Sequence, residues 1–136
     1  MEKLLGAALA ALITLGGCQS QTASVASGDT AQTALDWAGS YSGTLPCADC
    51  EGIKTSLNLA QGDTYVLKEE YLGKGGKPFT TKGTFTWDGA GQMITLDAAA
   101  DGRRFKVGEG RIWQLDLDGG VITGAMADLY ILTKQP

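Results

Sequence analysis

The fold class follows from the stretch Phe79-Thr80-Thr81-Lys82-Gly83-Thr84-Phe85-Thr86-Trp87, which Asp88-Gly89 ends. Its odd-numbered positions are mostly apolar or small, while Thr and Lys occupy the even-numbered positions between them. This period of two predicts a strand with one buried face, and the Asp-Gly pair that follows is typical of a hairpin turn.

The same alternation, interrupted by Gly and Asp every few positions, continues on both sides of this stretch. Helical periodicity is weak beyond Leu35, and only residues 125–129 favour a brief helical turn. A meander of about eight strands with short connections hides its edges completely by closing into a barrel. We therefore predict an all-β, antiparallel, up-and-down β-barrel, with a two-sheet sandwich as the alternative topology. The expected strands are residues 37–45, 53–59, 64–71, 79–87, 93–96, 103–107, 111–117 and 129–133.

The amino-acid composition excludes several classes of function. The chain has 136 residues, a formal net charge of −4 and no histidine. This acidic balance argues against binding to nucleic acid, whose phosphates require a clustered basic surface. The missing histidine excludes Ser-His-Asp and Cys-His nucleophile systems and HExxH zinc sites. The sequence therefore predicts one small domain that is not an enzyme.

The N-terminal segment has the features of an export signal. Residues 4–15 form an apolar run that is too short to span a bilayer but has the length of a signal-peptide core. Leu15-Gly16-Gly17-Cys18 follows, and it resembles a bacterial lipobox, in which Cys18 is lipidated and becomes the new N-terminus. The alternative is a plain signal peptide with an incidental cysteine. Gln19 after the cysteine favours the outer membrane over the inner one, with the protein facing the periplasm.

The domain boundaries follow from composition. Residues 1–17 are assigned to the lipoprotein signal peptide, and residues 18–34, rich in Ser, Thr, Gln and Ala, to a flexible tether. Such a polar stretch cannot bury enough apolar surface to offset the entropy of ordering it. The folded barrel is expected to occupy residues 35–136.

Once Cys18 is acylated, Cys47 and Cys50 remain as a CxxC pair. In an oxidising compartment they would form a short-range disulfide. As free thiolates they would suit soft Cu(I), and the carboxylates of Asp49 and Glu51 would help any cation. A catalytic redox pair normally has its first cysteine at a helix N-terminus, yet Pro46 precedes the pair and an alternating strand follows. Disulfide and Cu(I) site stay open, and no other cofactor is expected.

Two further groups of residues have a structural and a functional interpretation. The aromatic residues either fill a small barrel, which we favour, or line a ligand cavity. Arg103 and Arg104 are adjacent on an expected strand and so point to opposite faces, which predicts a solvated edge with one arginine capping the barrel. The aromatic residues concerned are Trp37, Trp87, Trp113, Tyr65, Tyr71 and Tyr130.

The region around the cysteine pair closely resembles the N-terminal domain of the NlpE family of copper resistance lipoproteins, and the likeness extends over roughly residues 37–133. This resemblance implies a lipocalin-like β-barrel. The matching positions are Tyr41, Gly43, Leu45-Pro46-Cys47-Ala48-Asp49-Cys50, Gly52-Ile53, Thr55, Leu57 and Leu59.

The resemblance implies a non-enzymatic outer-membrane lipoprotein that serves copper tolerance or the envelope-stress response by binding, with envelope proteins as partners. The alternatives are a lipocalin-like carrier of a small apolar ligand and a periplasmic thiol-redox protein. In the NlpE proteins best known for stress signalling a second, C-terminal domain follows the barrel, whereas this chain ends at Pro136. The resemblance therefore supports the anchor, the barrel and the CxxC loop more than it supports sensing through the Cpx pathway.

Overall fold

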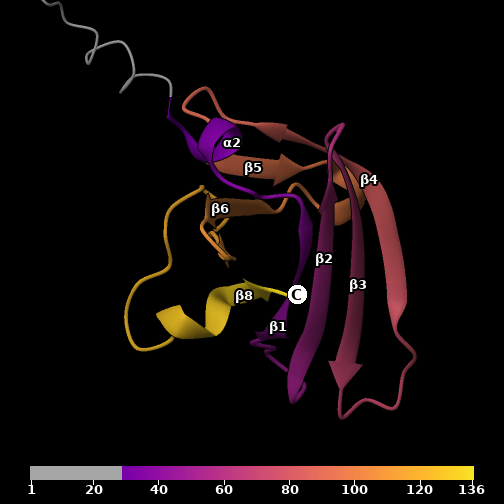
Figure 1. Ribbon diagram of the computed structural model, residues 1–136. Helices are drawn as coiled ribbons and strands as arrows, with labels where there is room; N and C mark the ends of the chain where they lie inside the picture. Colours follow the sequence, from indigo (N-terminus) through magenta and orange to yellow (C-terminus); the bar gives the residue numbers. More distant parts are fainter. Residues whose placement is uncertain (1–28) are drawn as a thin grey trace, which may run out of the picture.

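A computed structural model describes residues 29–136, which form a closed antiparallel barrel of eight strands in sequence order. The up-and-down topology expected from the alternating sequence is confirmed (Figure 1). The signal peptide, Cys18 and most of the expected tether lie outside the described residues. The strands are β1 (Gly39–Leu45), β2 (Gly52–Ala60), β3 (Thr64–Leu72), β4 (Phe79–Trp87), β5 (Met93–Leu96), β6 (Arg104–Gly108), β7 (Arg111–Gln114) and β8 (Ile131–Lys134).

The barrel closes between its first and last strands. Tyr41 of β1 lies opposite Lys134 of β8, and Ser42 lies opposite Thr133. Gly43 allows the two strands to approach, because a Cβ at this position would come within 2.9 Å of the Ile131 carbonyl oxygen. Closure pairs the first strand with the last, so neither presents the free outer edge that it would have in an open meander.

Three strands differ from the sequence expectation by two or more residues at one end, and the others agree to within one residue. β1 begins at Gly39 instead of residue 37, because Trp37 turns inward and is 6% exposed. β7 ends at Gln114, since the Asp116 carboxylate accepts backbone hydrogen bonds from Asp118 and Gly120 and so folds a turn. The last strand starts only at Ile131, because residues Ala127–Tyr130 form a 3₁₀ helix, η2.

A short helix, α2 (Ala31–Ala34), covers one end of the barrel (Figure 1). Thr30 caps it, the backbone N–H of Gln32 donates to the Gly91 carbonyl at 3.0 Å, and Ala31 is 4% exposed. Composition predicts a tether over residues 18–34, and α2 occupies the last four of these residues. The ordered body starts earlier because this segment buries Ala31 against the barrel and docks on the β4–β5 turn, a gain that local composition does not reveal.

Trp37 also helps to cover this end of the barrel. Its indole N–H donates to the Gln32 carbonyl at 3.1 Å, and its ring meets those of Phe85 and Trp87 edge-on, with centroids 5.8 and 5.4 Å away. The Tyr41 hydroxyl donates to the Trp37 carbonyl at 2.7 Å. Burial, together with the charge of Asp36, raises the pKa of Tyr41. The aromatic residues at this end therefore fill the barrel.

The core consists of the inward-facing residues of all eight strands. Gly83 leaves room for the half-buried Asp97, whose carboxylate occupies the space that a side chain at position 83 would need. Asp97 accepts a hydrogen bond from the Tyr65 hydroxyl at 2.6 Å and from the Thr84 backbone N–H at 3.0 Å. The fully buried side chains include Tyr41, Tyr65, Phe105, Leu57, Leu59, Leu67, Ile94, Leu96, Ile112, Leu132 and Thr55.

The described residues contain no helix of the length and hydropathy that crossing a bilayer would require.

Candidate functional site: the disulfide loop at the open end of the barrel

The CxxC pair lies in the loop that joins β1 to β2, at the barrel end opposite to α2 (Figure 1). Pro46 directly follows β1, and Gly52 begins β2. Gly52 is buried, has a φ of +152° and lies against the Thr44 methyl group, where a Cβ would approach to 2.7 Å. The loop can therefore return into β2 only with glycine at this position.

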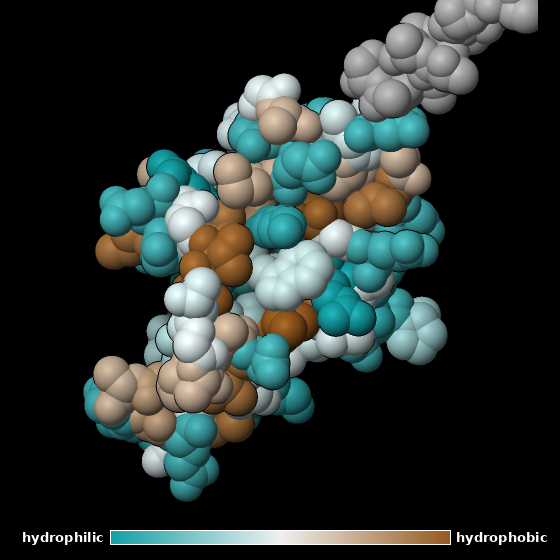
Figure 2. Space-filling model, turned by 90° about the vertical axis from the view of Figure 1, so that its left-hand side faces the viewer, coloured by the Kyte–Doolittle hydropathy of each residue, from teal (hydrophilic) through white to brown (hydrophobic). Residues whose placement is uncertain are grey.

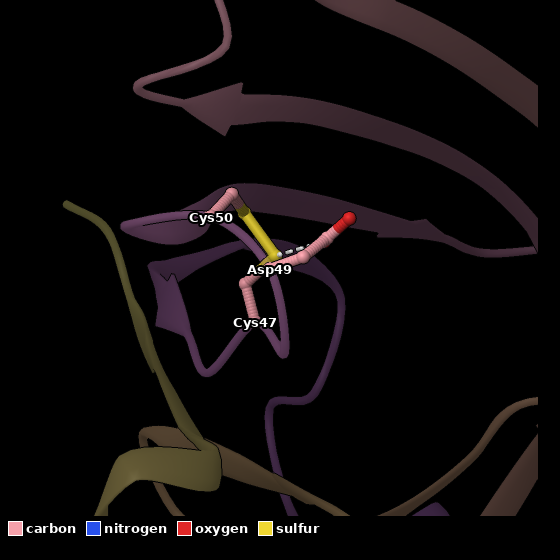
Figure 3. Close-up of side chains that lie close together, drawn as sticks. All are labelled: Cys47, Asp49 and Cys50. Atoms are coloured by element: carbon pink, nitrogen blue, oxygen red, sulfur yellow. Dashed lines mark hydrogen bonds between the residues drawn. A yellow bond between two sulfur atoms is a disulfide. The ribbon is translucent and has the colours of Figure 1, made fainter.

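Cys47 and Cys50 form a disulfide, with their Cα atoms 5.3 Å apart (Figure 3). Of the interpretations left open by the sequence, this is the one that the structure contains. Both cysteines are half-buried, whereas the Ala48 and Asp49 residues between them are exposed. The disulfide is thus accessible from the solvent side of the loop.

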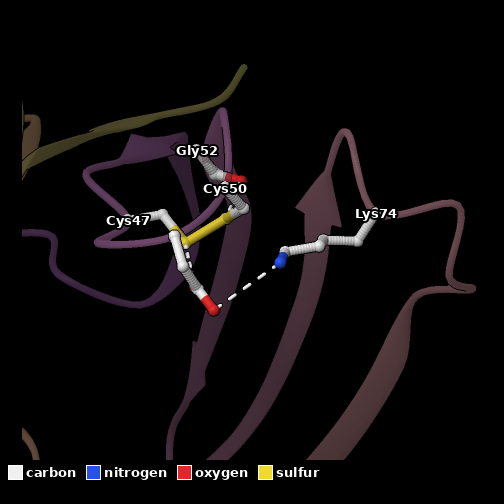
Figure 4. Close-up of polar contacts among 5 residues, drawn as sticks. Cys47, Cys50, Gly52 and Lys74 are labelled. Carbon is white, nitrogen blue, oxygen red and sulfur yellow. Dashed lines mark hydrogen bonds and ion pairs between the residues drawn. A yellow bond between two sulfur atoms is a disulfide. The ribbon is translucent and has the colours of Figure 1, made fainter.

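Asp49 links the loop to the neighbouring β3–β4 connection. Its Oδ2 lies 3.6 Å from the Nζ of Lys74, and its Oδ1 lies 3.6 Å from the Sγ of Cys47 (Figure 4). A disulfide sulfur carries no proton, so the second contact becomes a hydrogen bond only when Cys47 is reduced to the thiol. The ion pair is largely exposed and contributes little to stability.

Reduction would create a set of possible metal ligands. The Sγ atoms of Cys47 and Cys50 and a carboxylate oxygen of Asp49 all lie within 4.8 Å of one another. Two thiolates suit a soft monovalent ion such as Cu(I). Glu51, the other expected auxiliary ligand, is not in this group, because its carboxylate lies over Gly73.

The loop lacks the features of a thiol-redox catalyst. In the described part of the chain no helix begins at either cysteine, since the loop passes directly into β2. The charged group beside Cys47 is the carboxylate of Asp49, which is itself paired with Lys74. This arrangement gives the thiol-redox alternative no support.

Most of the motif residues that flank the cysteines have structural roles. Tyr41, Leu45 and Thr55 are buried, and the Thr55 hydroxyl donates to the Ile53 carbonyl at 2.9 Å. Gly43 and Gly52 allow close backbone packing, as described above. The exposed residues of the motif are Ala48 and Asp49, which lie between the two half-buried cysteines.

Sequence reasoning missed one partner inside the barrel. Glu69 of β3 is 3% exposed, and both of its carboxylate oxygens accept hydrogen bonds from Arg103, at 2.8 and 3.0 Å. These hydrogen bonds raise the pKa of Arg103, although burial opposes them. Arg103 is thus the arginine that turns inward, as one of the pair was expected to do. Glu69 sits at an inward position between Leu67 and Tyr71, and that alternation was the only signal for it.

The interior offers little support for the carrier alternative. The hollow that the structure does show has a volume of about 220 Å³ and is open to solvent. Most of its lining belongs to outward-facing positions of β1, β2 and β3, since these residues alternate with buried ones. The inward positions are occupied by packed side chains. The lining residues are Ser42, Lys54, Thr55, Ser56, Lys68, Glu69, Glu70 and Pro78.

Hydrophobic side chains also reach the surface. Leu117, in the connection between β7 and β8, is 92% exposed, and Val121, Met126 and Leu129 of the same connection are about half exposed. Figure 2 views the side of the molecule where this connection lies and shows hydrophobic residues in separate patches among polar ones.

Fold and site together define a small, closed antiparallel barrel domain that bears a disulfide loop at one end. The chain belongs to the NlpE N-terminal domain family, whose model matches residues 41–125.

Known relatives agree with this assignment. Lipoprotein NlpE of Escherichia coli K12 is 35% identical over 118 residues, which make up 85% of this chain and 50% of that protein. This chain therefore spans about half the length of that relative.

Two crystal structures are similar to the barrel. One, of a protein from Shewanella oneidensis described as a lipoprotein, is 48% identical and has a TM-score of 0.74, covering 79% of this chain and 96% of that one. The other is the Cpx pathway activator NlpE from Escherichia coli, with 34% identity, a TM-score of 0.53 and coverage of 63% of this chain and 46% of that one.

Proposed function

We propose that this chain is a lipid-anchored protein of the bacterial outer membrane that faces the periplasm and acts in the envelope-stress response by binding other envelope proteins. The observation that carries the proposal is the family match across the disulfide loop and most of the barrel, to a relative described as a Cpx pathway activator. Binding is the mechanism that we favour, because the sequence has no histidine to serve as a general base near neutral pH.

The anchor is part of this proposal. Acyl chains on Cys18 would hold the protein on the membrane, because two or three chains give stable attachment where a single one gives marginal attachment. The domain organisation proposed for the N-terminus is a signal peptide over residues 1–17 followed by a tether. Mass spectrometry of the purified membrane form tests it: a diacylglyceryl group on Cys18 is expected, and an unmodified chain that retains residues 1–17 would contradict it.

An envelope-stress reporter in bacteria tests the signalling role. Overproduction of the full chain should raise a Cpx-responsive reporter, and Cys18→Ala should abolish the response by removing the anchor. Equal protein levels in the two strains, checked by immunoblot, serve as the control. A reporter that stays at its basal level with the wild-type chain would refute the role.

Cu(I) binding is a second candidate, favoured by the closely spaced ligand atoms of Cys47, Cys50 and Asp49. The two thiolates would hold the ion once the disulfide is reduced, with the Asp49 carboxylate adding negative charge. Competition with a chromogenic Cu(I) chelator tests this directly. The reduced chain should take up one equivalent that the oxidised chain does not, and Cys47→Ser with Cys50→Ser should remove it. Identical titrations of all three forms would exclude a site at this loop.

A further inference from the structure

Along its first half, β4 pairs with a neighbouring strand on one side only. β3 accompanies β4 from Phe79 to Thr84, whereas β5 pairs with it only from Phe85 to Trp87. Beyond that point Asp97 makes the last contacts, since its backbone N–H donates to the Thr84 carbonyl and its carboxylate accepts the Thr84 N–H. In the described part of the chain, no strand covers this side of β4 from Phe79 to Gly83. Figure 1 shows this half of β4 extending away from β5 and β6.

The backbone groups of two residues face this gap. In an antiparallel strand, successive residues direct their N–H and C=O groups to alternate sides. Because Thr84 points toward Asp97 and Phe85 donates to Asp63 on the β3 side, the groups of Lys82 and Thr80 point into the gap. The described residues give them no hydrogen-bond partner there. They present the donors and acceptors that an added strand would need.

An exposed pair of rings lies at the end of this edge. Phe79 and Tyr71 stack with centroids 5.7 Å apart and an interplanar angle of 13°, and they are 45% and 38% exposed. Phe79 had been expected on the buried face of its strand. It is inward-facing but solvent-accessible, because no neighbouring strand covers it. The rings would pack against apolar side chains on the inner face of an added strand.

Two lysines lie on the outer face beside this edge. Lys68 lies opposite Thr80, and Lys82 follows two residues later on the same face. Among the described residues neither lysine has a carboxylate within ion-pair distance, whereas Lys74 is paired with Asp49 and Arg103 with Glu69. Within residues 29–136, Lys68 and Lys82 are therefore two unpaired cations on the same face of adjacent strands, in a chain whose formal net charge is −4.

We propose that the free edge of β4 at residues 79–82 binds an extended acidic segment of another envelope protein, which adds to the barrel as a strand. Backbone hydrogen bonds to Thr80 and Lys82 would fix the segment, its alternate apolar side chains would cover the Phe79–Tyr71 rings, and its carboxylates would meet Lys68 and Lys82. This inference rests on the proposed function, because it identifies the surface through which partners are bound.

The direct test uses the full lipidated chain in detergent micelles and a short peptide of alternating Glu and Val. NMR should show shifts of the backbone amides of Thr80 and Lys82 on addition of this peptide, and little change with a Lys-Val peptide of equal length. The double variant Lys68→Glu/Lys82→Glu should weaken binding of the acidic peptide by about tenfold or more. Lys54→Glu, on the outer face of β2, is the matched control and should bind as the wild type does.

A second variant separates charge from backbone pairing. Thr80→Pro removes an N–H that points away from β3, so it should abolish peptide binding while the barrel remains folded. Absence of amide shifts in the wild type, or equal shifts with the acidic and the basic peptide, would overturn the proposal, and Lys82 would then serve to keep a strand edge from aggregating.

The stress reporter separates this inference from the function on which it rests. If the wild-type chain raises the reporter and Lys68→Glu/Lys82→Glu raises it equally, the β4 edge is not the signalling surface, and the inference fails while the function stands. If the wild-type chain leaves the reporter at its basal level but binds the acidic peptide at Thr80 and Lys82, the proposed function fails and the binding edge stands.

Discussion

Glu69 and Arg103 form a bidentate ion pair inside the barrel, with Arg103 Nη1 2.8 Å from Glu69 Oε2 and Arg103 Nη2 3.0 Å from Glu69 Oε1. The side chain of Glu69 is 4% exposed and that of Arg103 is 24% exposed. The pair connects β3 with the residue that precedes β6, across the region where β4 has no neighbour on one side. It therefore links β3 to the start of β6 inside the barrel.

Glu69→Gln should destabilise the fold by about 2–3 kcal/mol, because Arg103 loses its counter-charge in a largely buried position. Urea denaturation at neutral pH measures the effect. Glu70→Gln, the outward-facing neighbour, is the control and should change stability by less than about 0.5 kcal/mol. The double variant Glu69→Leu/Arg103→Met should recover most of the loss, and failure to recover would show that the pair also fixes the barrel geometry.

Gly83→Ala should destabilise the barrel by about 1–3 kcal/mol, since its Cβ would displace the half-buried Asp97 carboxylate from its hydrogen bonds. Thermal unfolding followed by circular dichroism tests this expectation. Gly89→Ala offers a matched control, because a Cβ there meets nothing within 4 Å. Equal melting temperatures for the two variants would mean that Asp97 moves aside without loss.

Acid should weaken the contact between Asp97 and Tyr65. The Tyr65 hydroxyl, followed by the Thr84 N–H, lowers the pKa of Asp97, while burial and then the Asp97 hydrogen bond raise the pKa of Tyr65. A carboxyl group with a lowered folded-state pKa contributes stability above its unfolded value, near 3.9, and loses it as the pH falls through the folded value.

Tyr65→Phe should therefore reduce the acid-induced loss of stability that the wild type shows below about pH 4. Urea midpoints at pH 7 and pH 3 provide the measurement. Thr86→Ser, an exposed change elsewhere on β4, should leave the pH dependence as in the wild type. A Tyr65→Phe curve parallel to that of the wild type would assign the acid sensitivity to other carboxylates.

Reduction of the Cys47–Cys50 disulfide should cost about 2 kcal/mol at most, because closing so short a loop removes little entropy from the unfolded chain. Urea denaturation with and without a reductant gives this difference, and the Cys47→Ser/Cys50→Ser variant should show no effect of the reductant. A much larger loss would mean that the disulfide organises the barrel as well as its own loop.

Trp37→Ala should cost about 3–5 kcal/mol, because a large buried side chain that meets Phe85 and Trp87 would leave a cavity. Trp113→Ala is the comparison. Trp113 is only partly buried, between Lys106 and Arg111, and should cost clearly less. Calorimetric melting of both variants compares the two losses of stability. Equal losses would contradict the assignment of Trp37 as the side chain that fills the barrel end beside α2.

Local sequence was sufficient to predict the strands and to recognise the motif. The period of two in residues 79–87, repeated along the chain between Gly and Asp turns, determined an antiparallel meander, because alternation places one face of each strand in the core. The CxxC pair and its neighbours identified the family for the same reason, since they are contiguous in the chain.

Only the tertiary structure decided which residues meet across the barrel. The partner of Arg103 is 34 positions away, and the alternation around Glu69 said only that it faces inward. The exposure of Phe79 and the burial of Ala31 also depend on neighbours distant in sequence: a missing strand beside β4 in one case, and the Gly91 turn in the other. Periodicity encodes the face on which a side chain lies, whereas its partner and its contact with solvent are set by the closure of the barrel.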